Sequence, residues 1–251
     1  MRYVRSWWLG PATLSHLFPS AFLKFYLFDF DNTFEPMTTP SEYHLFELAI
    51  VNSPDDPRRN LPTDVEPGSR VLDVGCGIGQ SLMATDFAGC ARHGVDIDAN
   101  AIAAGNEMFP DLDLKVSRAE KLPYVDSSFD LVYSRVAIPY TDVPLALREI
   151  VRVAKPGGRV WLSLHPWSME RREIFGAFRS LSVRRIVDRA YVAGNSLLLA
   201  AIGRCFARPW SGQYESFQFP ARTRAMLLDL GCEAVTTGTD QFFVVEARKK
   251  I

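Results

Sequence analysis

One stretch of nine residues constrains the fold of this chain more than any other. Residues 71–79 read Val-Leu-Asp-Val-Gly-Cys-Gly-Ile-Gly, a short apolar run followed by glycine at every second position. The pattern predicts a buried strand that enters a tight turn, because glycine tolerates positive φ and lets another group approach the backbone. Residues 94–98, Gly-Val-Asp-Ile-Asp, predict a second strand that ends in acid. A carboxylate at the tip of the neighbouring strand suits a ribose, so the pair predicts a site for a nucleoside-containing cofactor.

The spacing of the glycines argues against two common nucleotide sites. In the dinucleotide fingerprint G-x-G-x-x-G, Gly75 and Gly77 would fit, but the next slot holds Gln80 and the third glycine comes one residue early, at Gly79. No Lys-Ser or Lys-Thr pair follows, which excludes a P-loop. The pattern present is D-x-G-x-G-x-G, with Asp73 at the end of the strand.

Three further motifs follow these two in order. They are Ala-Glu-Lys-Leu-Pro-Tyr at 119–124, Ser-Ser-Phe-Asp-Leu-Val at 127–132, and Leu-Arg-Glu-Ile-Val-Arg-Val-Ala-Lys-Pro-Gly-Gly at 147–158. Together the five motifs resemble those of the class I S-adenosylmethionine-dependent methyltransferases, most closely the methyltransferase type 11 branch that contains the quinone-biosynthesis C-methyltransferases. The resemblance covers about a hundred residues. It implies an α/β fold, Rossmann-like, with a mostly parallel seven-stranded sheet and helices on both faces, as the alternation of strands and helices also indicates.

The same resemblance implies S-adenosyl-L-methionine as the cofactor and assigns its methionine end. Backbone groups of Gly75, Cys76 and Gly77 would lie against the methionine part, and Asp73 would face its ammonium. Ser134, at the end of the fourth strand, would lie near the methionine carboxylate and the methyl group.

The adenosine end follows in the same way. Asp96 would accept hydrogen bonds from both ribose hydroxyls, Ile97 would pack on the adenine, and Ala119 would donate its N–H to the ring. The family often has an acid before the Ala-Glu pair, where this chain has Arg118, so either Glu120 serves the adenine amino group or that contact is missing. The predicted cofactor set is Asp73, Gly75, Cys76, Gly77, Gly79, Asp96, Ile97, Ala119, Glu120 and Ser134.

Four segments are predicted along the chain. Residues 1–60 form an aromatic extension, 61–165 the cofactor-binding core, 166–219 an insertion after the fifth strand, and 220–251 a helix and two antiparallel strands that complete the core. The extension includes a predicted helix at 41–51 with Tyr43, Phe46 and Ile50 on one face. It would be a lid over the site, a cover for the sheet, or a peripheral membrane contact.

Individual elements can be predicted within these segments. We expect a strand at 71–74, a helix between the first two strands, strands at 112–116, 131–134 and 160–165, a helix at 144–155 stopped by Pro-Gly-Gly, a helix at 223–230, and strands at 234–237 and 242–247. Residues 28–33 resemble the D-x-D-x-T loop of haloacid dehalogenase-like phosphatases but lack that enzyme's domain, so they predict a simple turn.

The insertion has a distinct composition. It holds eight arginines against four acidic residues. They would recognise an acidic group such as phosphate or carboxylate, or form a solvated helix face. Its apolar run 197–202 would form the core of a helix.

Composition excludes several function classes. A net charge of −1 argues against broad nucleic-acid binding. The four cysteines are scattered without a C-x-x-C pair, so neither a metal site nor a disulfide framework is expected and a cytoplasmic setting is the default. No apolar run reaches the length of a membrane span.

Catalytic residues are less defined, because methyl transfer is an in-line displacement that needs a base only when the acceptor loses a proton. Candidates follow the fourth strand (Arg135, Tyr140, Asp142) and the fifth. We select His165 as base or orienting group and Tyr140 as a substrate contact. The aromatic residues Trp167, Trp210 and Tyr214 would line an acceptor pocket or serve packing.

The predicted function is a cytoplasmic methyltransferase that acts on a small molecule. The alternatives are an inactive cofactor-binding subunit and a methyltransferase for a macromolecule. Residues alone leave the acceptor atom, the use of a base and the oligomeric state open.

Overall fold

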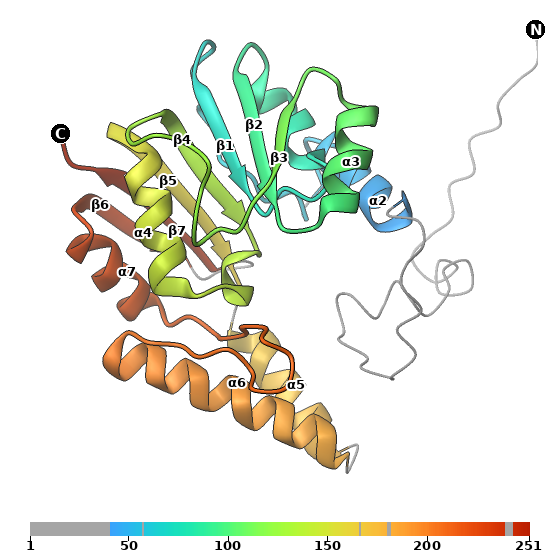
Figure 1. Cartoon of the computed structure of the whole chain (residues 1–251), viewed down its shortest axis with the longest axis vertical. Helices are drawn as coiled ribbons and strands as arrows, with labels where there is room; N and C mark the ends of the chain where they lie inside the picture. The colour runs from blue at the N-terminus through green and yellow to red at the C-terminus, as the bar shows by residue number, and fades with distance from the viewer. Residues whose placement is uncertain (1–40, 57, 166, 180–181, 239–242) are drawn as a thin grey trace, which may run out of the picture. The chain divides into compact units, whose positions relative to one another are not determined.

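The structure, a computed structural model, describes residues 41–251 except 57, 166, 180–181 and 239–242 (Figure 1). Residues Thr39–Ile251 form one compact unit. The predicted turn at 28–33 and the aromatic part of the extension lie outside the described residues.

A seven-stranded sheet forms the centre of this unit, with the order β3-β2-β1-β4-β5-β7-β6. Strands β1 to β5 are parallel, and β7 runs antiparallel to both β5 and β6. This confirms the predicted mostly parallel sheet with two closing antiparallel strands. The strands are β1 (Arg70–Val74), β2 (Ala91–Asp96), β3 (Asp113–Val116), β4 (Phe129–Arg135), β5 (Ala154–Leu164), β6 (Cys232–Gly238) and β7 (Phe243–Lys249).

Helix α4 (Val143–Val153) shows how the sequence sets a helix of the core. The Asp142 carboxylate caps it by accepting from the Leu145 N–H, and an apolar side of the helix is buried at Leu147, Ile150 and Val151. The helix ends before the predicted position, because Ala154 is extended and opens β5. The Pro-Gly-Gly at 156–158, which was predicted to stop the helix, therefore lies inside β5, three residues beyond the end of α4.

The helix predicted between β1 and β2 is absent. Two 3₁₀ turns, η2 (Gln80–Met83) and η3 (Thr85–Phe87), stand there, separated by Ala84 with an extended backbone. Leu82 and Phe87 are both fully buried. A continuous helix would place side chains five residues apart roughly 140° around its axis, so the break at Ala84 lets both enter the core.

Helix α2 (Ser41–Val51) forms where it was predicted and packs against η2. Its buried residues include Ile50, Val51 and also Glu47, which the sequence pattern did not mark. Phe46 is half-buried, and the Tyr43 side chain lies outside the described residues.

The remaining helices are α3 (Ala99–Met108), η4 (Ile138–Tyr140), α5 (Trp167–Arg179), α6 (Val183–Ile202) and α7 (Pro220–Asp229). Helices α5 and α6 pack against each other beside the sheet, and residues 203–219 then return to α7 (Figure 1). The run 197–202 is helical as predicted, yet Leu197, Leu198 and Ile202 are exposed. None of the helices described here is long and apolar enough to cross a bilayer.

Candidate active site

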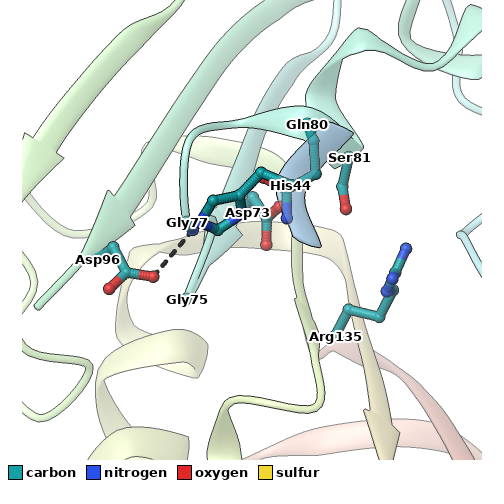
Figure 2. A pocket seen from close by; sticks show the side chains of 8 residues that line it. All are labelled: His44, Asp73, Gly75, Gly77, Gln80, Ser81, Asp96 and Arg135. Atoms are coloured by element: carbon teal, nitrogen blue, oxygen red, sulfur yellow. Dashed lines mark hydrogen bonds between the residues drawn. The ribbon is translucent and has the colours of Figure 1, made fainter. Parts of the chain in front are cut away.

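The glycine turn after β1 is held against the end of β2. Gly75 and Gly77 have φ of +85° and +57°, which favours glycine at both positions. A Cβ on Gly75 would lie 2.1 Å from the Cβ of Ala137, so a larger residue has no room there. The N–H of Gly77 donates to the Asp96 carboxylate at 2.8 Å (Figure 2). This bond fixes the turn relative to the acid that ends β2.

Asp73 is a buried carboxyl at the bottom of this turn. Its Oδ1 has no hydrogen-bond partner in the described part of the chain. Burial raises the pKa of Asp73 to about 8, Asp96 adds to the rise, and the Tyr133 hydroxyl offsets part of it. The carboxyl is therefore mostly protonated at neutral pH until a cation approaches it.

A cavity of about 160 Å³ opens in front of Asp73. Sites that enclose a whole ligand measure roughly 300–1,000 Å³, so this cavity has room for part of a nucleoside cofactor. Eight residues line it: His44, Asp73, Gly75, Gly77, Gln80, Ser81, Asp96 and Arg135 (Figure 2).

Helix α2 adds His44 to the cavity, a residue that sequence reasoning missed. A Cβ on Gly77 would lie 3.0 Å from Cε1 of His44. Burial lowers the pKa of His44, which Asp96 and Asp98 partly offset. The buried Glu47 forms an ion pair with Arg135 at the end of β4. The sequence offered one signal for Glu47, an acid on the apolar side of a predicted helix. No signal linked α2 to the glycine turn, because the two are far apart along the chain.

Two residues predicted for the adenosine end, Asp96 and Ile97, lie at the end of β2, and two others, Ala119 and Glu120, lie elsewhere in the fold. Asp96 also accepts from the Asp98 N–H at 2.9 Å, and the neighbouring Ile97 side chain is 64% exposed. Ala119 is half-buried against the core. One oxygen of Glu120 accepts from the Asp142 N–H at 2.8 Å, which ties it to the start of α4. Their roles toward adenine and ribose stay predictions.

Three members of the predicted cofactor set, Cys76, Gly79 and Ser134, contribute to packing or hydrogen bonding inside the fold. Cys76 is buried in the core. A Cβ on Gly79 would lie 2.7 Å from Cδ1 of Leu112, so this glycine permits close packing. Ser134 is buried and its hydroxyl donates to the Val74 carbonyl at 2.7 Å. None of the three lines the cavity.

The two predicted catalytic residues meet. The Tyr140 hydroxyl, at the end of η4, lies 3.1 Å from Nε2 of His165, which follows β5. Burial lowers the pKa of His165 to about 4, with Glu215 opposing and Arg189 adding to the shift. The imidazole is therefore neutral at pH 7, and its lowered pKa makes it a weaker base than an ordinary histidine.

The other candidates from the sequence lie elsewhere. Asp142 caps α4. Trp210 is 61% exposed with its ring 6.1 Å from that of Tyr191, and Tyr214 packs against the main core. Trp167 begins α5, and its side chain lies outside the described residues.

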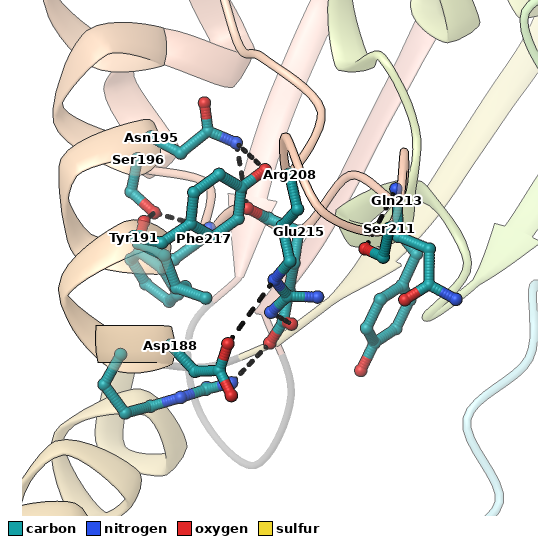
Figure 3. A network of polar contacts seen from close by, with 12 residues as sticks. Asp188, Tyr191, Asn195, Ser196, Arg208, Ser211, Gln213, Glu215 and Phe217 are labelled. Carbon is teal, nitrogen blue, oxygen red and sulfur yellow. Dashed lines mark hydrogen bonds and ion pairs between the residues drawn. The ribbon is translucent and has the colours of Figure 1, made fainter. Parts of the chain in front are cut away.

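A buried polar network joins α6 to the segment 203–219 (Figure 3). Glu215 pairs with both Arg189, at 2.9 Å, and Arg208. The Asn195 amide donates to the Glu215 carbonyl and accepts from the Phe206 N–H. Two arginines of the insertion thus serve the fold. Among the described residues no cluster could hold a metal ion, and the four cysteines are free.

Known proteins share the motif-bearing part of this chain. Residues 72–162 match the family described as "Methyltransferase domain". Over 118 residues, 46% of this chain and 47% of the relative, it is 35% identical to demethylmenaquinone methyltransferase of Renibacterium salmoninarum. Over 107 residues, 40% of this chain and 22% of the relative, it is 36% identical to phosphoethanolamine N-methyltransferase 3 of Arabidopsis thaliana.

The fold agrees with these matches. It superposes on a SAM-dependent methyltransferase structure from Methanosarcina mazei with a TM-score of 0.51 at 21% identity, covering 74% of this chain and 95% of that chain. Residues 72–162 are therefore a methyltransferase domain of the class I S-adenosylmethionine-dependent family. The chain spans less than half the length of the two relatives, and these are named for different acceptors.

Proposed function

We propose that this chain is an S-adenosyl-L-methionine-dependent methyltransferase that acts on a small molecule. The observation that carries the proposal is the pair of carboxyls at the ends of β1 and β2, Asp73 and Asp96, joined by the glycine turn. A ligand with an ammonium group and a ribose diol is complementary to both. When bound, this cofactor supplies a methyl group on a sulfonium, already activated for displacement.

At the methionine end, Asp73 and Arg135 would hold the two charges of the amino acid. Asp73 offers a buried oxygen without a partner among the described residues, and Arg135 lines the same cavity. The ligand carboxylate would compete with Glu47 for Arg135, because Glu47 now forms an ion pair with this guanidinium. Helix α2, which carries Glu47 and His44, would then adjust as the cofactor enters.

At the acceptor, neutral His165 would take the proton that an attacking hydroxyl, amine or activated carbon loses. Its hydrogen bond with Tyr140 would hold the ring in one orientation. The relatives named for demethylmenaquinone and phosphoethanolamine support a small molecule over a macromolecule. A cytoplasmic location is part of the proposal, supported by the four free cysteines.

Isothermal titration with S-adenosylmethionine tests the cofactor site. We expect Asp96→Ala to bind about a hundredfold or more weakly, since two charge-assisted hydrogen bonds are lost. Asp113→Ala, an acid at the start of β3, is the matched control and should bind as the wild type does. Wild-type protein that binds neither S-adenosylmethionine nor S-adenosylhomocysteine would contradict the proposal.

Proton release tests the role of Asp73. The carboxyl is protonated below its pKa of about 8 and must ionise to pair with the ligand's ammonium. At pH 6.5 binding should therefore release about one proton per cofactor, measured as the dependence of the heat on buffer ionisation enthalpy. Asp73→Asn should abolish the release, and its persistence in this variant would remove Asp73 from the role.

Turnover separates an enzyme from a binding subunit. In an acceptor screen read by S-adenosylhomocysteine formation, His165→Ala should lower kcat by roughly a hundredfold or more, while cofactor affinity stays unchanged. Tyr140→Phe should have a smaller effect, because it removes only the orienting hydroxyl. Tight cofactor binding without turnover across many acceptors would favour the inactive subunit.

A further inference from the structure

Helix α6 exposes its apolar side. Val183, Val187, Leu197, Leu198 and Ile202 are exposed, and the small Ala190, Gly194 and Ala201 fill the positions between them. The spacing of three or four residues places all of them in one stripe along the helix, which extends about 30 Å over its 20 residues. We call this the apolar stripe. Single exposed apolar residues are ordinary, but a continuous stripe marks an interaction surface.

The opposite side of α6 faces the protein and combines polar residues with the apolar Val192 and Leu199. Asn195 and Ser196 are buried and hydrogen-bond the segment 203–219, and Arg189 is buried against Glu215 (Figure 3). The helix cannot turn its apolar side inward without breaking these contacts. The exposure of the stripe is therefore fixed by the packing of the helix.

Charges of one sign accompany the stripe. Between residues 171 and 212, every charged side chain that the structure describes as exposed is an arginine, while Glu173 and Asp188 are half-buried. Phe175, Phe206 and Trp210 are exposed in the same part of the chain. The exposed arginines are Arg171, Arg172, Arg179, Arg184 and Arg204.

We propose that α6 binds the surface of an anionic lipid bilayer and lies in its interface with the apolar stripe inserted. An apolar helix face accompanied by arginines and aromatic side chains suits the boundary between headgroups and acyl chains, where arginine can keep its charge beside lipid phosphates. A second copy of the chain fits this surface less well, because a two-fold interface would bring the same exposed arginines together.

The proposal has a consequence for the acceptor, which rests on the proposed function. Helix α6 contributes Arg189 to the surroundings of His165, and the segment it holds donates from the Ser216 N–H to the Pro139 carbonyl beside Tyr140. Attachment through α6 would place the Tyr140–His165 pair near the membrane surface. The acceptor would then be an amphipathic or lipid-soluble small molecule drawn from the bilayer.

Vesicle flotation of the full chain tests the proposal without any activity measurement. We expect the wild type to float with phosphatidylcholine vesicles that contain about 30 mol% phosphatidylglycerol, and to float less with phosphatidylcholine alone. L197E combined with I202E should lower the bound fraction at least about tenfold, since charged groups cannot enter the interface. R184Q combined with R204Q should reduce the preference for the anionic vesicles.

The matched control is V125E, which charges an exposed apolar residue outside the insertion and should float like the wild type. Calorimetry with S-adenosylmethionine on the same samples shows that each variant is folded. If the wild type does not bind the cofactor, that result contradicts the proposed function and leaves the flotation result unaffected. Two results would overturn the membrane proposal. One is wild-type protein that floats with neither kind of vesicle. If light scattering then shows a dimer that L197E/I202E separates, the stripe binds a second copy of the chain instead. The other is an L197E/I202E variant that floats as well as the wild type.

Discussion

Helices α4 and α6 carry similar apolar patterns and use them in opposite ways. In α4 the side chains of Leu147, Ile150 and Val151 are buried against the sheet. In α6 the exposed stripe includes Leu197 and Ile202, while the buried side holds Val192 and Leu199 together with three polar residues, Arg189, Asn195 and Ser196. The comparison teaches that apolar spacing identifies a face of a helix but not the direction in which that face points.

The two helices should therefore draw their stability from different interactions. Burial of apolar surface holds α4 in place. In α6, hydrogen bonds and ion pairs within the network of Figure 3 add to the burial of Val192 and Leu199. Three sets of substitutions, taken from the largest expected effect to the smallest, test this distinction.

Removal of the central acid of the network should have the largest effect. Glu215→Ala leaves Arg189 and Arg208 buried without their shared counter-charge, and we expect the free energy of unfolding to fall by about 3–5 kcal/mol. Urea denaturation measures it. Asp126→Ala is the matched control, since Asp126 is 76% exposed in its pair with Arg152 and should cost at most about 1 kcal/mol. Equal effects would show that the network does not hold α6.

Leucine truncation compares the two apolar faces directly. Leu147→Ala in α4 opens a cavity in the core and should lower the free energy of unfolding by about 2–5 kcal/mol. The same change at the exposed Leu198 of α6 should stay within about 0.5 kcal/mol. Both values come from the same urea titration. A cost of several kcal/mol at Leu198 would mean that the protein itself covers the stripe.

The helix caps should behave alike and give the smallest effect. Asp142 caps α4, and the Ser182 hydroxyl accepts from the Arg185 N–H at the start of α6. Asp142→Ala and Ser182→Ala should each cost about 1 kcal/mol, because capping depends on the first turn and not on the face that is buried. Asp142→Asn keeps an acceptor and should recover most of the loss. A cost confined to α4 would indicate that α6 begins independently of its cap.

Much of the fold and of the cofactor site could be predicted from the sequence, since the signals are local. The glycine turn at Gly75 and Gly77 and the acid that ends the second strand at Asp96 can each be recognised from the few residues around them. The predicted helix between β1 and β2 was wrong because its backbone follows the burial of Leu82 and Phe87, which depends on the surrounding core. The contact of Tyr140 with His165 joins the end of η4 to the residue after β5, and no spacing along the chain encodes it.

The sheet, the glycine turn and the cofactor class could be predicted from the amino-acid pattern, because strand alternation, positive φ and the order of the motifs are properties of neighbouring residues. Three features came from the packing of distant elements: His44 lines the cavity and Glu47 pairs with Arg135 beside it, burial raises the pKa of Asp73, and α6 turns an apolar side outward. Burial, pKa and the facing of a helix all depend on which distant elements exclude water from a side chain. That exclusion is a property of the packed fold.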